Sequence, residues 1–177
     1  MTFSNPAGTA AAAAGGYVRA LLDLLGPQDP LVVLEAQLPW LERRTAGLDA
    51  ARLRRAEAPG KWSVIEVIQH LADAELVMAF RFRMVLTENE PDLQGYDQDR
   101  WVSVLRYTEV PVDLALGQLR GLRNANLRLW RSLTPEQRER AGLHSERGRE
   151  SVDLMLRMTA GHDLVHRRQI DRILGGG

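Results

Sequence analysis

The feature that most constrains the fold is a long amphipathic segment that begins with a helix-capping signature. Ser63 and Glu66 have the spacing of a capping box, in which each side chain accepts a hydrogen bond from the other residue's backbone N–H. Over residues 64–86, apolar side chains recur at intervals of three, four and seven positions. This spacing places them on one face of a helix. The segment therefore predicts a long helix that packs against other helices.

Other segments share this helical periodicity and no segment shows the alternation of a strand. Beside the first helix, we expect helices over residues 17–25, 31–46, 102–107, 112–133 and 152–174. Pro39 predicts a kink or a break in the second of these five. Residues 88–98 and the polar residues 142–148 are predicted to be loops. Long helices joined by loops in one small domain predict an all-α protein, a four-helix bundle.

The length of 177 residues is that of one domain. Residues 17–174 are expected to form it, after a disordered leader over residues 1–16 and before a flexible tail over 175–177. The leader is rich in Ala and Gly and lacks the basic and long apolar regions of a secretory signal. A cytoplasmic location is therefore expected.

Charge and composition exclude several classes of function. The chain has 23 basic and 23 acidic side chains, so it has no global field that would attract nucleic acid or an anionic membrane. It has no cysteine, which excludes disulfides, thiolate metal sites and a cysteine nucleophile. No apolar stretch of about 18 residues is present, so no membrane span is expected.

The four histidines are the main candidates for chemistry. His162 and His166 are four positions apart in a predicted helix, which places both rings on one face, one turn apart. His70 lies at the edge of the apolar face of the helix over 64–86. If these two helices pack together, three imidazoles converge and form an open divalent-metal site. The alternatives are a hydrogen-bonded core histidine and a surface pair, and His144 is expected to be a solvated bystander in its loop.

Several neighbouring side chains are candidates for supporting roles. Asp73 and Asp163 are candidate acceptors that orient a ligand ring, although a solvated or salt-bridged carboxylate is the alternative for each and is favoured for Asp163. Gln169 follows His166 by one turn and either lines the site or bonds to another helix. Trp62 and Trp101 are expected to pack the bundle ends. A substrate carboxylate would suit an arginine fork, and the candidates are Arg81, Arg123, Arg167 and Arg168.

Two motifs carry a resemblance to a known family. Residues 62–75, WSVIEVIQHLADAE, resemble the WSxxE…HLxDxE segment of the DinB-like, YfiT-like superfamily. Residues 162–170, HDLVHRRQI, are similar to the closing motif of that family, and the loop over 90–97 with Trp101 also fits its pattern. The similarity extends over residues 59–174, which is most of the expected domain.

The resemblance implies a four-helix bundle with up-down-down-up topology. It implies one divalent cation held by His70, His162 and His166, all of which are present. Imidazole ligands suit zinc or nickel, which are expected first, and also iron or copper.

Two classes of function follow. The first is an enzyme: a metal-dependent thiol S-transferase that uses a low-molecular-weight thiol, as characterised members of the superfamily do, or a hydrolase that uses metal-activated water on a small molecule. The second is a non-catalytic, stress-associated bundle that binds a metal or a small ligand, or that dimerises through its helix faces. A homodimer is expected, and nucleic acid and membrane are not expected as partners.

Overall fold

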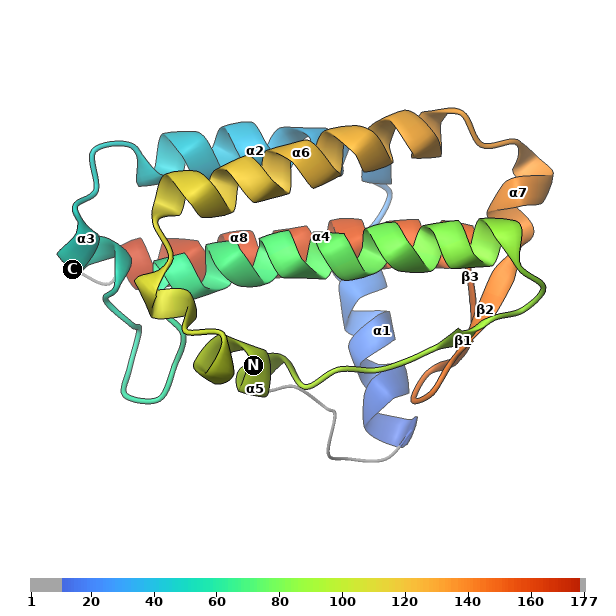
Figure 1. Cartoon of the computed structure of the whole chain (residues 1–177), viewed down its shortest axis with the longest axis horizontal. Helices are drawn as coiled ribbons and strands as arrows, with labels where there is room; N and C mark the ends of the chain where they lie inside the picture. Colours follow the sequence, from blue (N-terminus) through green and yellow to red (C-terminus); the bar gives the residue numbers. More distant parts are fainter. Residues whose placement is uncertain (1–10, 176–177) are drawn as a thin grey trace.

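The computed structural model describes residues 11–175, and within them four long helices form the body of the molecule (Figure 1). They are α2 (Pro30–Thr45), α4 (Val64–Thr87), α6 (Val112–Arg131) and α8 (Val152–Gly175). In Figure 1, α2 and α8 run in one direction and α4 and α6 in the other. The predicted all-α, up-down-down-up four-helix bundle is therefore confirmed. Each long helix contacts two of the others, since α4 packs on α6 and α8, and α2 packs on the same two.

The parallel pair α4 and α6 requires a long connection, because the chain must return to the starting end of the bundle. This crossover contains the short strand β1 (Asp92–Leu93), helix α5 (Gln98–Val104) and the 3-10 turn η1 (Tyr107–Glu109). It differs from the single short helix expected over 102–107. Buried Asp73 of α4 holds the crossover in place by accepting hydrogen bonds from the Tyr107 hydroxyl and from Gln118 of α6.

Most of the expected helix ends are confirmed. The Ser63–Glu66 capping box is present, and Ser151 accepts from the Leu154 backbone N–H at the start of α8. Helix α2 continues through Pro39 without a break. Two shorter helices, α3 (Ala50–Leu53) and α7 (Pro135–Glu139), occupy the connections.

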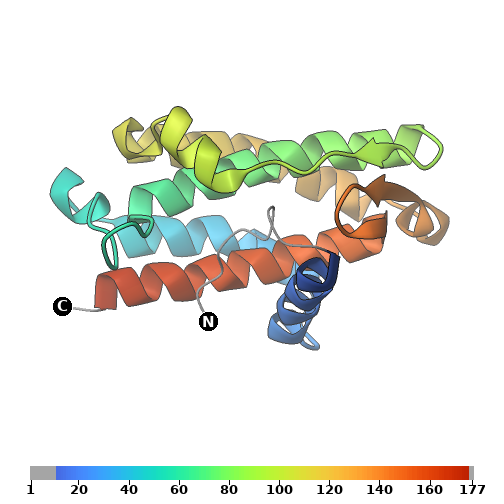
Figure 2. The same ribbon diagram turned by 90° about the horizontal axis from the view of Figure 1, so that it is seen from below.

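Helix α1 (Ala11–Leu25) lies across α8 (Figure 2). It begins at Ala11, six positions before the expected start at residue 17. Gly161 of α8 allows the close approach, because a Cβ there would lie 2.4 Å from the carbonyl oxygen of Leu21. The disordered leader is expected over residues 1–16, but residues 11–16 are the first part of α1. Residues 1–10 lie outside the described residues, and so do the last two residues of the expected tail.

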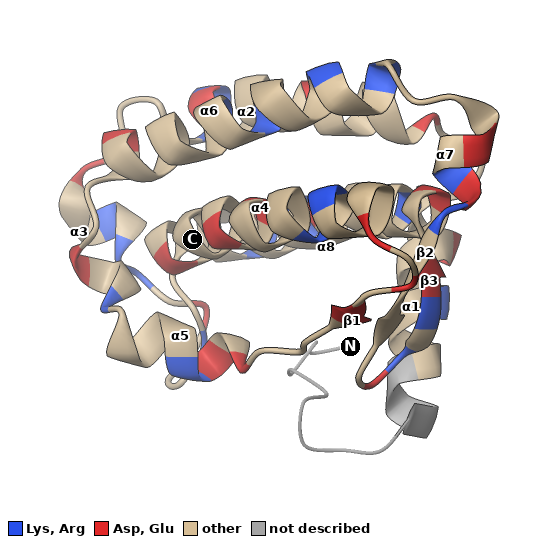
Figure 3. Ribbon diagram, turned by 45° about the vertical axis from the view of Figure 1, so that its right-hand side comes forward, with Lys and Arg blue, Asp and Glu red and all other residues tan. Residues whose placement is uncertain are grey.

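The prediction that the chain contains no strands is wrong. In the described part, β2 (Ala141–His144) pairs antiparallel with β3 (Gly148–Ser151) and parallel with β1. The expected loop over 142–148 is thus mostly a tight hairpin, in which Gly148 has a φ of 75°. Strands of two to four residues are too short to show a periodic pattern. The hairpin lies beside α1 and carries both signs of charge (Figure 3).

The core lies between the four long helices and is filled by aliphatic side chains. One cluster at the α3 end includes Ile68 and Ile170, and a second at the hairpin end includes Phe82 and Trp130, whose rings meet edge to face at 5.0 Å. Among the described helices, none has the length and apolar character needed to cross a bilayer.

Candidate metal centre

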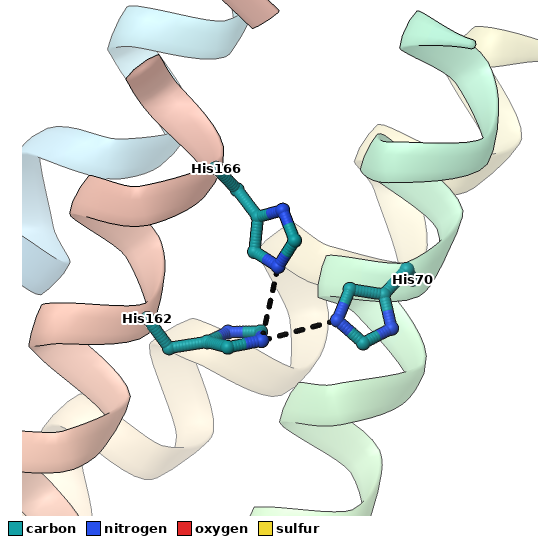
Figure 4. A group of neighbouring side chains, drawn as sticks. All are labelled: His70, His162 and His166. Atoms are coloured by element: carbon teal, nitrogen blue, oxygen red, sulfur yellow. Dashed lines mark hydrogen bonds between the residues drawn. The ribbon is translucent and has the colours of Figure 1, made fainter. Parts of the chain in front are cut away.

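Two antiparallel helices, α4 and α8, bring three histidines together in the middle of the bundle (Figure 4). His70 comes from α4, and His162 and His166 come from adjacent turns of α8. The capping box at Ser63 sets where α4 begins, and therefore fixes the direction in which His70 points two turns later. The structure thus places the three predicted residues at one point.

Their ring nitrogens are within hydrogen-bond distance of one another. The Nε2 atom of His162 lies 3.1 Å from Nε2 of His70 and 3.1 Å from Nε2 of His166. One nitrogen from each of the three rings lies within 4.8 Å of the others. The three Nε2 atoms therefore face a common centre, as Figure 4 shows.

The environment keeps the three imidazoles neutral. Burial, together with the charge of Arg123, lowers the pKa of His162 to about 4. Burial and the neighbouring imidazoles lower the pKa values of His70 and His166 well below the usual range. Each ring consequently keeps a nitrogen lone pair at neutral pH, which is the form that binds metals.

The donor set fits a divalent cation. Nitrogens that bind one zinc ion tetrahedrally at about 2.0–2.1 Å are themselves about 3.3 Å apart, near the two separations of 3.1 Å. Lone pairs that face each other at this distance repel unless a proton or a cation lies between them. Three imidazoles also leave coordination positions for water or substrate, as in catalytic rather than structural sites.

Two side chains support the cluster from outside. Gln169 Oε1 lies 2.8 Å from Nδ1 of His166, so it accepts that N–H and leaves Nε2 free to act as a ligand. The predicted supporting role of Gln169 thus has a specific contact. Trp62 does more than pack a bundle end, since its ring lies 4.9 Å from that of His70 and stacks on that of His166 at 6.3 Å. The indole N–H donates to Asp99 of α5.

A cavity of about 100 Å³ adjoins the cluster, and His162 forms part of its wall. The cavity lies between α4, α8, α1, the crossover and the β2–β3 hairpin, and residues of all five line it. Its volume is of the order of the cavity of about 150 Å³ that admits benzene. The histidine cluster therefore has a space beside it for a small molecule.

The two candidate aspartates have other partners. Asp163 pairs with Arg123, with Nη1 and Oδ2 2.7 Å apart, which is the salt-bridged form of the alternative favoured for this residue. Asp73 accepts from Tyr107, Gln118 and Gln69 rather than from a histidine. Neither carboxylate is therefore placed to orient a ligand ring.

The four candidate arginines have different surroundings. Arg123 is buried in ion pairs with Asp163 and Glu75. Arg167 donates to Gln37 and lies over the ring of Trp40, and Arg168 is exposed. Arg81 lies on the cavity wall, and its guanidinium has no carboxylate partner among the described residues. None of the other three arginines combines these two properties.

The expectation for His144 is wrong. It ends strand β2, is 3% exposed and lines the same cavity as His162. The hairpin folds the short 141–151 segment back against α4 and α8, which removes the side chain from solvent. Gly148, whose positive φ closes the turn, is the sequence signal that could have indicated a hairpin here.

Comparison with known proteins agrees with this geometry. Residues 34–170 match the model of the DinB superfamily. A protein of Oceanobacillus iheyensis named "Putative metal-dependent hydrolase" is 30% identical over 130 residues, which cover 73% of this chain and 75% of that protein. A protein of the same name from Bacillus mycoides is 28% identical over the same shares of the two chains.

A solved structure has the same architecture. YfiT from Bacillus subtilis, described as "a probable metal-dependent hydrolase with an unusual four-helix bundle topology", superposes with a TM-score of 0.74 at 25% identity. The match covers 82% of this chain and 86% of YfiT. The sequence motifs, the bundle topology and these matches agree, and the chain belongs to the DinB superfamily.

Proposed function

We propose that this protein is a metal-dependent hydrolase of a small molecule, with His70, His162 and His166 as the metal ligands. One observation carries the proposal: three neutral imidazoles from two helices face one point, and one of them borders a cavity. The names of the Oceanobacillus and Bacillus relatives support hydrolysis as the reaction. A divalent cation in such a site, when bound, lowers the pKa of water enough to supply hydroxide near neutral pH.

Two side chains of the protein would hold and cover the histidines for this chemistry. Gln169 fixes the tautomer of His166 through its Nδ1. Trp62 covers the rings of His70 and His166 and limits the access of water to them. His162 lies on the cavity wall, so a small molecule held in the cavity could reach this side of the histidine cluster. Substrate would therefore approach from the cavity rather than from the Trp62 side.

Metal analysis combined with an activity screen tests the proposal. The untagged chain is stripped with a chelator, reloaded with zinc or nickel, and assayed against small esters and amides. We expect one metal ion per chain and turnover that depends on it. His166→Ala should lose both, whereas Arg168→Gln, an exposed change two positions later on α8, should keep both. Equal metal content in the parent chain and His166→Ala would refute the proposed ligand set.

The same assay separates the other predicted functions. Conjugation of cysteine to an electrophile, at rates above hydrolysis and lost in His166→Ala, would replace the hydrolase by a thiol S-transferase at the same site. Stoichiometric metal without turnover in either assay would favour the non-catalytic binding protein.

A further inference from the structure

Arg81 is a buried cation that lacks a counter-ion. Its side chain is 6% exposed, and it forms no ion pair with any carboxylate in residues 11–175. It donates through Nη2 to the backbone oxygen of Gln94 in the crossover. Glu146 and Glu150 attract the guanidinium from farther away, but Arg147 engages Glu150. Buried charges are normally paired, so the remaining N–H groups of Arg81 indicate a place for an acceptor that is not part of the protein.

His144 contributes a second donor without an acceptor. Its Nδ1 accepts the backbone N–H of Glu146 at 3.1 Å, so in the neutral ring the proton is on Nε2. Burial, followed by the charge of Arg147, lowers the pKa of His144 to about 4, which keeps the ring neutral. The Nε2 atom is buried and has no hydrogen-bond partner in the structure as described. An N–H group buried in this way is unfavourable unless a ligand accepts from it.

The two donors border one cavity, which they share with His162. The charge of Arg81 is also near enough to contribute, as the last of the causes, to the lowered pKa of His144. Arg81 follows His70 by eleven positions on α4, or about 16 Å of helix. The donors therefore occupy the hairpin side of the cavity, and the histidine cluster lies toward its other side.

We propose that Arg81 and His144 form a carboxylate-binding subsite, and that the substrate is a small organic acid whose carboxylate is held there. A guanidinium presents two parallel N–H groups that match the two oxygens of a planar carboxylate, and His144 supplies a further donor from a fixed backbone position. The assignment of the acid as substrate rests on the proposed function. The binding of the carboxylate does not, because neither donor belongs to the metal ligands.

Binding of butyrate to the metal-free 177-residue chain, measured by calorimetry, tests the subsite. Butyramide serves as the uncharged probe of nearly the same shape. We expect saturable binding of butyrate that is at least tenfold tighter than that of butyramide. Arg81→Gln and His144→Phe should each weaken butyrate binding about tenfold, the effect of losing one charge-assisted hydrogen bond. Arg128→Gln, an exposed change on α6, should leave binding unchanged.

Further variants separate this proposal from the metal site. His166→Ala should bind butyrate as well as the parent chain, so the subsite stands even if no metal is found. Far-UV circular dichroism verifies that each variant is folded, and His144→Phe provides the test if Arg81→Gln does not fold.

Several results would overturn the subsite. Equal binding of butyrate and butyramide would do so, and so would no binding of butyrate. Butyrate binding that appears only with zinc and survives Arg81→Gln would place the carboxylate on the metal and would also overturn the subsite. Tighter binding of inorganic phosphate that depends on Arg81 would overturn the assignment of a carboxylate.

Discussion

Two buried arginines of this protein have opposite surroundings. Arg123 of α6 is 3% exposed and forms ion pairs with Asp163 and Glu75, at 2.7 and 2.9 Å. Arg81 of α4 is 6% exposed and has no carboxylate partner in the described chain. Burial alone would lower the pKa of both. The two carboxylates raise the pKa of Arg123, whereas burial and the repulsion of Arg147 lower that of Arg81.

The difference in carboxylate partners indicates a different role for each of the two arginines. Arg123 joins its own helix, α6, to the other three long helices, since it pairs with Glu75 of α4 and Asp163 of α8 and also donates to the Leu34 backbone oxygen of α2 at 2.9 Å. The side chain of Arg81 lines a cavity. A buried cation that is paired with internal carboxylates stabilises the structure, whereas one that lacks a carboxylate partner leaves its charge for a ligand.

Arg123→Met should produce the largest loss of stability. The substitution leaves the carboxylates of Asp163 and Glu75 buried without a counter-ion, which costs about 3–5 kcal/mol. Urea denaturation monitored by circular dichroism measures this loss. If Arg123→Met unfolds at the same urea concentration as the parent chain, the ion pairs do not stabilise the bundle, and the contrast with Arg81 fails.

Acid should destabilise the protein through His144. The unfolded residue takes up a proton near pH 6.5, whereas the folded residue does so near pH 4. Between these values the unfolded state binds more protons, so stability is full above pH 6.5 and falls as the pH drops. His144→Phe lacks this effect and should lose about 2–3 kcal/mol less than the parent between pH 7 and pH 4. Parallel stability curves would show that His144 is not held neutral.

Gln169→Ala sharpens the comparison between a histidine with a partner and one without. His166 has Gln169 at its Nδ1, whereas Nε2 of His144 has no acceptor. Loss of an outer partner typically weakens metal binding at least tenfold, or about 1.4 kcal/mol. Zinc titration against a competing chelator measures the change. Unchanged zinc affinity would show that Gln169 does not orient the ligand ring.

Arg81→Gln should have the smallest effect, within about 1 kcal/mol of the parent stability, because Arg81 has no carboxylate partner and the substitution removes only its hydrogen bond to the Gln94 backbone oxygen. The same urea experiment provides the value. A loss as large as that of Arg123→Met would mean that Arg81 is a structural residue, and the distinction between the two arginines would disappear.

The helices and their caps were predictable because both depend on local chemistry. Ser63 and Glu66 are three positions apart and form the capping box wherever α4 packs. The spacing of His162 and His166 likewise fixes their separation on one helix. The structural environment of His144 was not predictable in this way, because it depends on β1, which is about 50 positions away and pairs with β2.

The sequence by itself determined the helix-rich fold class, the two-histidine face of α8 and, through its motifs, the family. These features are set by interactions between residues a few positions apart. Only the tertiary structure decided that Asp163 neutralises Arg123, that Trp62 covers the histidine cluster, and that Arg81 and His144 share a cavity with His162. The physical reason is that burial and pairing depend on which distant segments meet, and no local pattern records whether a buried donor has found an acceptor.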